Sequence, residues 1–254
     1  MDKYLPKIIG PALVLGAGGI GSEIVRAFVA YGATDVAFTY GKNKDSAEAL
    51  KAEIETAGVR THIGSFDPKD AEALSAFLDD SAKVFGQEIT TVVNTVGISP
   101  NTPLFEQTLE EWRQVFEVNV FSSFFSSRFI ATRMKNRGTK GSITLITSTN
   151  GINSQSSISA HYDSSKAAQA MMMRILAEEY APAGIRINGV APGWINTKLN
   201  DTLPEDERAK EMAKIWSGRF ADPAEVAAFA VFVASTGGSY IYGQNLMIDG
   251  GYRC

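Results

Sequence analysis

Short runs of consecutive apolar residues alternate along the chain with longer segments in which apolar residues recur every three or four positions. The short runs predict seven strands, at residues 12–15, 35–39, 61–64, 91–94, 142–147, 185–191 and 245–249. The longer segments predict helices, and the longest of these runs from about Thr108 to Met134. Strands that alternate with helices indicate βαβ units, and strands that are apolar on both faces indicate a parallel sheet covered on both sides. We therefore expect a doubly wound α/β fold.

No Pro/Gly-rich linker, internal repeat or low-complexity tract divides the chain, so residues 1–254 are expected to form a single domain. One stretch, residues 195–220, is polar and has no clear period. We expect it to make an excursion over a binding cleft. Trp194 and Trp216 lie beside or within this stretch and are candidates to line a substrate pocket, with core packing as the alternative for Trp194.

The composition narrows the class of protein. Hydrophobic residues make up 44% of the chain, enough for a large core, and a net charge of −4 without a long basic block gives no nucleic-acid footprint. The first ten residues contain no apolar h-region and no apolar run approaches ~18 residues, so we expect neither a signal peptide nor a membrane span. The single cysteine, Cys254, rules out a disulfide framework and favours a reducing compartment. A cytoplasmic protein is the expectation.

The first predicted turn from strand to helix is rich in glycine. Gly16, Gly18 and Gly21 have the spacing G-x-G-x-x-G in the segment LVLGAGGIGSEIV, and Gly19 and Ile20 lie between them. A sharp turn into a helix lets the backbone approach a pyrophosphate and presents free N–H groups to it. A tight glycine turn without a ligand is the alternative. The position between a strand and a helix favours a Rossmann-type dinucleotide site at these five residues.

The second predicted strand leads into the segment FTYGKNK, residues 38–44, where an acidic residue would bind the ribose 2′-hydroxyl of NAD. No acid stands there, because Asp45 comes several residues late. Tyr40, Lys42 and Lys44 occupy the segment instead, and the two lysines suit the 2′-phosphate of NADP. We therefore expect NADP(H) in preference to NAD(H), with ordinary surface lysines as the alternative.

The pattern Tyr-x-x-x-Lys occurs twice, as Tyr40/Lys44 and as Tyr162/Lys166. The first pair would lie at the adenosine end of the nucleotide, far from any reacting carbon. The second lies on one face of a predicted helix, after a strand that leads into Ser148. An ammonium group beside a phenol lowers the phenol pKa from ~10, so Tyr162 can act as an acid toward a carbonyl oxygen that Ser148 also binds. A buried structural tyrosine with a lysine alongside is the alternative.

Together these segments resemble the short-chain dehydrogenase/reductase family, in the classical branch that contains 3-oxoacyl-[acyl-carrier-protein] reductases. The resemblance covers nearly the whole chain. Besides the glycine loop, it rests on the segments NTVG (94–97), EVNV (117–120), ITSTNG (146–151), YDSSK (162–166), IRINGVAPGWINT (185–197), GRFADPAEVA (218–227) and YGQNLMIDGG (242–251). It implies a single Rossmann-type domain with helices on both faces of the sheet.

The resemblance also implies a catalytic tetrad. In it, Asn119 would bind a water that relays protons to Lys166, and Lys166 would also hold the nicotinamide ribose. Ser148 would orient the substrate, with Thr149 as a competitor for this role, and Tyr162 would be the acid in reduction. Further cofactor contacts are implied for Asn94 (under the adenosine), Gly97, Pro192, Gly193, Ile195 and Thr197, and Trp194 is a candidate substrate contact.

The chain departs from the family pattern at the nucleotide site. Its glycine loop is one residue shorter, and it lacks the family's threonine and the basic residue often found there in NADP-dependent members. No aspartate matches the adenine contact after the third strand, where Ser65 stands as a replacement. Thr95 replaces the second asparagine of the family's Asn-Asn-Ala-Gly segment.

The activity that the resemblance implies is reduction of a carbonyl to an alcohol by direct hydride transfer. A 3-oxoacyl thioester is the leading substrate, which would mean fatty acid biosynthesis and an acyl-carrier protein as partner. Arg133, Lys135 and Arg137 are candidates for a basic cleft entrance. A sugar, polyol, steroid or small ketone is the alternative. A catalytically silent NADP-sensing protein and, remotely, a Ser–Lys hydrolase are alternatives of other classes. The family also implies a homotetramer, with residues 121–127 in a helix–helix seam.

Overall fold

The centre of the fold is a parallel sheet of seven strands in the order β3-β2-β1-β4-β5-β6-β7. The computed structural model describes residues 5–153, 155–197, 203 and 205–253, so Cys254 lies outside the described residues. The strands are β1 (Ala12–Leu15), β2 (Asp35–Thr39), β3 (Arg60–Gly64), β4 (Thr91–Asn94), β5 (Gly141–Ile146), β6 (Ile185–Pro192) and β7 (Asn245–Ile248). All seven predicted strands are confirmed, each with its ends within one residue of the prediction.

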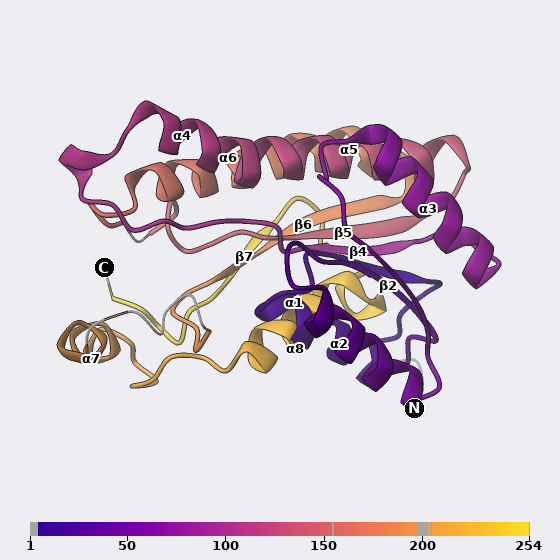
Figure 1. The fold of residues 1–254 in the computed structure, drawn as a ribbon, viewed down its shortest axis with the longest axis horizontal. Coiled ribbons are helices and arrows are strands. Elements are labelled where there is room, and N and C mark those ends of the chain that lie inside the picture. The colour runs from indigo at the N-terminus through magenta and orange to yellow at the C-terminus, as the bar shows by residue number, and fades with distance from the viewer. Residues whose placement is uncertain (1–4, 154, 198–202, 204, 254) are drawn as a thin grey trace.

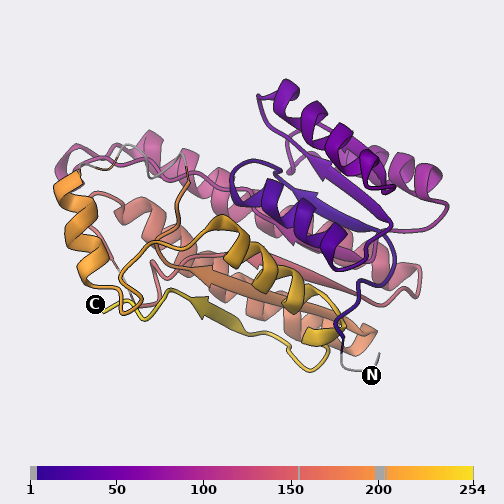
Figure 2. The ribbon, with the colours of Figure 1, turned by 90° about the horizontal axis from the view of Figure 1, so that it is seen from below.

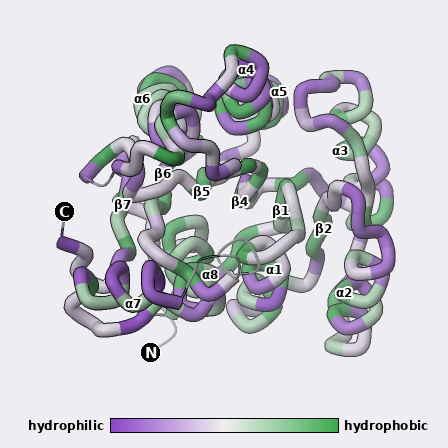
Figure 3. The backbone as a smooth tube through the Cα atoms, turned by 60° about the vertical axis from the view of Figure 1, so that its left-hand side comes forward, coloured by the Kyte–Doolittle hydropathy of each residue, from purple (hydrophilic) through white to green (hydrophobic). Residues whose placement is uncertain are grey.

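Helices cover both faces of this sheet (Figures 1 and 3). They are α1 (Ile20–Ala30), α2 (Lys44–Thr56), α3 (Ala71–Phe85), α4 (Leu109–Phe116), α5 (Ser122–Asn136), α6 (Ala160–Tyr180), α7 (Glu205–Ala213) and α8 (Pro223–Ala234). The buried side chains of α1, α2 and α8 form one core and those of α3, α5 and α6 form another. Along β1, Val14 enters the first core and Leu13 and Leu15 enter the second, which explains why the strand is apolar throughout.

Local side chains determine several helix ends by satisfying free backbone groups. Asp70 accepts hydrogen bonds from the first N–H groups of α3, and Gly86 ends that helix at φ +73°, a conformation that glycine adopts without strain. Thr108 and Glu111 form a capping box at the start of α4. The helix predicted from Thr108 to Met134 is in fact three consecutive segments, because a π-helical segment, Glu117–Phe121, separates α4 from α5.

The strand order reverses between β1 and β4, and in such sheets ligands bind at the carboxyl edge beside this point. In the predicted excursion at 195–220, Ile195 pairs with Ala221 and α7 lies between them, while residues 198–202 and 204 are outside the described part of the chain. Figure 2 shows α7 beside the end of the chain. Over the described residues, no helix is both long and apolar enough to span a membrane, and no group of His, Cys, Asp or Glu side chains is arranged to hold a metal ion.

Candidate active site

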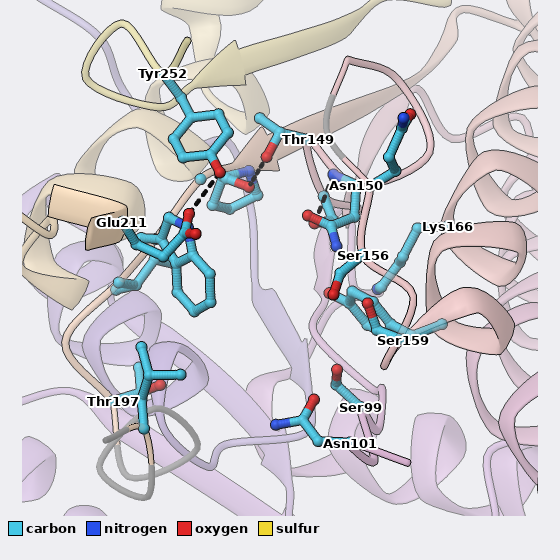
Figure 4. Close-up of a pocket in the computed structure, with 18 of the residues that line it drawn as sticks. Ser99, Asn101, Thr149, Asn150, Ser156, Ser159, Lys166, Thr197, Glu211 and Tyr252 are labelled. Carbon is cyan, nitrogen blue, oxygen red and sulfur yellow. Dashed lines mark hydrogen bonds between the residues drawn. The ribbon is translucent and has the colours of Figure 1, made fainter. Parts of the chain in front are cut away.

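A cavity of about 830 Å³ opens at the carboxyl edge of the sheet, beside the ends of β4, β5 and β6 (Figure 4). Its wall includes the start of α1, the loops after these strands, α7 and a tyrosine near the C-terminus. The cavity brings together ten of the residues predicted from the sequence: Ile20, Gly97, Ser148, Tyr162, Lys166, Pro192, Gly193, Trp194, Ile195 and Thr197.

The glycine loop joins β1 to α1 at one side of this cavity. Gly16 and Gly19 have φ angles of +91° and +51°, which favour glycine. Hydrogen bonds fix the loop to its neighbours, since Thr95 Oγ1 donates to the Gly16 carbonyl (2.5 Å) and Gly16 N donates to Thr39 Oγ1 (2.9 Å). A Cβ atom at Gly18 or Gly19 would meet no protein atom within 4 Å. The backbone is therefore open to a ligand just before the N-terminus of α1, which fits the pyrophosphate of a dinucleotide.

The predicted adenosine side lies next to the glycine loop, outside the cavity. Ser65 Oγ donates a hydrogen bond to the Gly41 carbonyl (3.1 Å), which fixes the segment after β2. Lys42, in that segment, is exposed, and Tyr40 is partly buried against the core beneath β2. Because the segment carries no carboxylate before Asp45, nothing there would repel a 2′-phosphate.

Tyr162 lies in the first turn of α6, and Ser148, just beyond β5, lines the cavity with it and lies close enough to its phenol to lower the phenol pKa. The competitor Thr149 instead donates to a backbone carbonyl at the end of β6 (3.3 Å). Burial raises the pKa of Tyr162 above its ordinary value, the hydroxyl of Ser148 opposes this rise, and the carboxylate of Asp163 adds to it. The phenol therefore keeps its proton at neutral pH, as a proton donor must.

Lys166, one turn further along α6, is buried with its Nζ 5.6 Å from the centre of the Tyr162 ring. Its Nζ donates to the carbonyl of Ile146 and to Oε1 of Gln169, both at 3.0 Å. Burial lowers the pKa of Lys166 to about 7. Lys166 is then only partly charged at neutral pH. We expected Lys166 to lower the pKa of Tyr162, but the pKa of Tyr162 is raised instead.

Asn119 lies in the π-helical segment between α4 and α5 and is completely buried. Its Nδ2 donates to the Ile98 carbonyl and to Ser165 Oγ, both at 2.9 Å, and its Oδ1 accepts from Ile98 N at 2.8 Å. The side chain therefore fastens the loop after β4 to α6. Since both polar atoms of the amide are engaged, the water relay to Lys166 that the resemblance implies would need the backbone carbonyl of Asn119.

Asn94 is the last residue of β4 and the residue predicted to lie under the adenosine. Its side chain is buried, with Nδ2 donating to Ser126 Oγ (3.3 Å) and Oδ1 accepting from Val96 N (2.9 Å). Both polar atoms of this side chain are hydrogen-bonded inside the protein, and a cofactor contact of Asn94 stays a prediction. Thr95 and Gly97, which follow it, line the cavity instead.

Trp194 lines the cavity and stacks on Phe220, with their ring centres 5.2 Å apart and their planes 12° from parallel. Trp194 therefore belongs both to the pocket wall and to a packed aromatic pair. Trp216 is 72% exposed and is not part of the cavity wall, so the prediction that it lines a pocket is wrong.

Comparison with known proteins connects this geometry to a family. Residues 15–253 match the family model described as Enoyl-(Acyl carrier protein) reductase. A crystal structure of a short-chain type dehydrogenase/reductase from Mycobacterium marinum has a TM-score of 0.91 and 30% identity, and the match covers 100% of this chain and 99% of that one. The chain is a short-chain dehydrogenase/reductase.

Two curated relatives of this short-chain dehydrogenase/reductase are named as dehydrogenases. It is 36% identical to galactitol 2-dehydrogenase (L-tagatose-forming) of Cereibacter sphaeroides, over 95% of this chain and 94% of that protein. It is 34% identical to cis-4-hydroxycyclohexanecarboxylate dehydrogenase of Sinomonas cyclohexanicum, over 95% of each chain.

In the far wall of the cavity of this short-chain dehydrogenase/reductase, the side chains of Glu211, Lys214 and Tyr252 were not among the predicted site residues. Glu211 there accepts hydrogen bonds from Tyr252 OH (2.5 Å), Lys214 Nζ (2.7 Å) and Trp194 Nε1 (3.2 Å), and Figure 4 shows Tyr252 directed at Glu211. Burial opposes ionisation of Glu211, but these hydrogen bonds, led by Lys214, hold its pKa below the ordinary value. No local sequence signal marks this cluster, because only the fold brings the C-terminal segment beside α7.

The three basic side chains near the end of α5 do not lie at the cavity entrance. They pair with acidic side chains: Arg133 with Asp79 (2.7 Å) and Glu88 (3.0 Å), Arg137 with Glu88, and Lys135 with Glu179 (3.3 Å). The end of α5 leads into the start of β5, which is the edge of the sheet opposite the cavity. The expectation of a basic entrance formed by these residues is therefore wrong.

Proposed function

We propose that the protein is an NADP(H)-dependent oxidoreductase that interconverts a secondary alcohol and a ketone. The observation that carries this proposal is the placement of Ser148, Tyr162 and, one turn further along the helix, Lys166 together in the wall of a cavity that adjoins a glycine loop. The family of the chain and the dehydrogenase names of its relatives support it.

In the direction of reduction, Tyr162 is proposed to give its phenolic proton to the substrate oxygen. The hydroxyl of Ser148 would hydrogen-bond the same oxygen and hold it against Tyr162. Lys166 would stabilise the phenolate that remains, and Asn119 would keep the loop at Ile98 in place against α6. The nicotinamide, when bound, supplies or takes up the hydride at the substrate carbon.

The residues present fit a dinucleotide, and NADP(H) is the proposed form. The open backbone at Gly18 and Gly19 would receive the pyrophosphate, and Ile195 and Thr197, both in the cavity wall, would lie against the nicotinamide. Lys42 is the proposed partner of the 2′-phosphate, because it is exposed in the segment where NAD-specific sites carry an acid.

The substrate that we propose is a small, neutral, polyhydroxylated molecule such as a sugar or polyol. Beyond Tyr162, much of the wall consists of uncharged hydrogen-bonding side chains: Ser99, Asn101, Asn150, Gln155, Ser156, Ser157 and Ser159 (Figure 4). Two lysines in the wall are paired with acids, Lys214 with Glu211 and Lys210 with Asp206, so these lysines do not favour an anionic substrate. Substrate hydroxyl groups can exchange hydrogen bonds with such a wall. The relative named galactitol 2-dehydrogenase supports this class.

A 3-oxoacyl thioester is the second candidate, and an apolar rim favours it. Ile98 and Ile158 line the cavity, and Leu104 and Phe105, in the neighbouring loop, are 46% and 99% exposed. Thr102 N donates to the Ile158 carbonyl (2.9 Å), which holds the two loops together. Such a rim suits an acyl chain, and an acyl-carrier protein would then be the partner.

The purified protein should oxidise galactitol or a related polyol with NADP⁺, and it should reduce the matching ketose with NADPH. Absorbance of the reduced nucleotide measures both directions, and 3-oxoacyl thioesters, steroids and small ketones complete the panel. With NADP⁺, kcat/KM should exceed the value with NAD⁺ about 10- to 100-fold, the worth of one charge-assisted contact.

The panel separates the candidates. Turnover confined to thioesters would move the assignment to the second candidate. Tight nucleotide binding without turnover in either direction would favour the NADP-sensing protein, and ester hydrolysis without nucleotide would favour the Ser–Lys hydrolase.

We further propose a homotetramer, as the family resemblance implies. Large apolar side chains are exposed on the two long helices of one layer, at exposed fractions of 42–59%. They are Phe121 at the end of the π-helical segment, Phe125 on α5, and Met171 and Ile175 on α6. Side chains of this kind favour contact with a second copy. Light scattering should give the mass of four chains, and the mass of one chain would contradict the proposal.

A further inference from the structure

A fully buried glutamine joins the reacting lysine to the neighbouring helix. Gln169 lies one turn beyond Lys166 on α6, and both Gln169 and Ser123 on α5 are 0% exposed. Gln169 Oε1 accepts a hydrogen bond from Lys166 Nζ at 3.0 Å, and Gln169 Nε2 donates to Ser123 Oγ at 2.8 Å. The amide oxygen of Gln169 must face Lys166, because a lysine ammonium only donates hydrogen bonds and therefore needs an acceptor.

The surroundings of Lys166 leave one of its three hydrogens for the cavity. The Ile146 carbonyl takes one and Gln169 takes another, and Lys166 itself is part of the cavity wall. Two bonds of this kind restrict a long, flexible side chain to one position.

Among the residues that the structure describes, the hydrogen-bond acceptors of Lys166 are uncharged: β5 contributes the Ile146 carbonyl and α6 contributes Gln169. The phenol of Tyr162, also on α6, is the titratable neighbour of Lys166. The amide of Asn119 in the π-helical segment lies near Gly97 and is bonded to Ile98 and Ser165. Asp163 also lies on α6, but its carboxylate accepts hydrogen bonds from Asn150, Ser156 and Ser159.

We propose that Gln169 is a positioning residue that holds Lys166 toward the cavity and determines how readily its amine keeps a proton. A leucine in place of Gln169 would leave the ammonium with one protein acceptor fewer, and a glutamate would give it a counter-charge. Burial lowers the pKa of Lys166 to about 7, which is consistent with a lysine that has neutral acceptors. The role in catalysis rests on the proposed function, but the effect on the proton of Lys166 does not.

The pH dependence of stability without ligand tests the effect on the proton. A lysine in the unfolded chain has a pKa of ~10.4, so between pH ~7 and ~10 the unfolded state binds more protons at this site than the folded state. The contribution of Lys166 to the free energy of unfolding therefore increases as the pH rises from ~7 to ~10. Lys166→Met removes this contribution, so the difference between wild type and Lys166→Met isolates it.

Gln169→Leu should lower the folded pKa of Lys166 by about one to two units, which extends the rise in stability down to pH ~5–6. Gln169→Glu should raise that pKa, so the rise shrinks or disappears. Ser123→Ala removes the anchor of Gln169 but keeps its oxygen, so it should act in the same direction as the leucine variant with a smaller shift. Denaturant titrations of these variants from pH 5 to 10 give, for each variant, the pH range over which the free energy of unfolding rises.

Activity provides the second measurement. The alkaline limb of kcat/KM against pH should move to lower pH in Gln169→Leu and to higher pH in Gln169→Glu. If wild type turns over no substrate, the proposed function fails. The pH dependence of the free energy of unfolding still tests the effect of Gln169 on the proton of Lys166. If both Gln169 variants show the stability change over the same pH range as wild type and lose only overall stability, Gln169 serves only in packing and the inference is overturned. If Gln169→Leu does not fold, Gln169→Glu and Ser123→Ala decide.

Discussion

Replacing Tyr162 by phenylalanine should lower kcat/KM about 10²- to 10⁴-fold, the usual contribution of a positioned acid or base. The change removes one oxygen atom, the group that faces the cavity with Ser148 and that is proposed to give its proton to the substrate. The ring itself remains, so its packing near Lys166 is kept. Nucleotide affinity should therefore stay within a few-fold of wild type. Initial rates with the best substrate of the panel and a nucleotide titration measure the two effects.

Tyr180→Phe is a matched control for this experiment. Tyr180 lies on the same helix, far along α6 from the cavity, and its hydroxyl is hydrogen-bonded to Thr132 Oγ1 (2.6 Å) and donates to the Arg128 carbonyl (3.3 Å). Removing that oxygen should cost about 1–3 kcal/mol of unfolding free energy, the worth of two neutral hydrogen bonds, and leave activity unchanged. Full activity in Tyr162→Phe would contradict the role proposed for the phenol, because that role requires the oxygen that the change removes.

The strands were predictable because the centre of a parallel sheet leaves a strong mark on the sequence. Every residue of β1 and β4 is buried, so β1 is a short apolar run throughout and β4 has an apolar centre, Val92 and Val93. The glycine spacing and the Tyr162/Lys166 pair were predictable for a related reason, since each lies within a few residues of one turn or one helix. The part of the site that depends on local geometry could be read from the chain.

The rest of the site depends on segments that meet only in the folded protein. The π-helical segment at Asn119 has no proline or glycine to signal it, and its amide binds Ile98 and Ser165, 21 and 46 residues away. Tyr252 reaches Glu211 across 41 residues. Arg133 looked like part of a binding surface because its acidic partners, on α3 and before β4, are distant in sequence. In each case the partner is far along the chain, which no local pattern records.

Gly21→Ala and Gly18→Ala should both weaken nucleotide binding, but only Gly21→Ala should also lower the free energy of unfolding. A Cβ at Gly21 would lie 2.0 Å from the Gly16 carbonyl oxygen and 3.1 Å from Thr95 Oγ1, which is itself bonded to that oxygen. The loop and α1 must separate to make room, because the obstacle is backbone. We expect Gly21→Ala to cost about 1–3 kcal/mol of unfolding free energy, as overpacking does, and to weaken nucleotide binding as a consequence.

Gly18→Ala should leave the fold intact and weaken nucleotide binding directly. Its Cβ would meet no protein atom within 4 Å, so the melting temperature should remain close to wild type. The same space is where the pyrophosphate must approach the backbone, and an overlap of this size should raise the Kd for NADPH about 10- to 100-fold. Calorimetric titration and thermal unfolding of both variants separate the two effects. Wild-type affinity in Gly18→Ala would mean that this shortened loop holds the pyrophosphate away from Gly18, because an added methyl group there would then meet no ligand either.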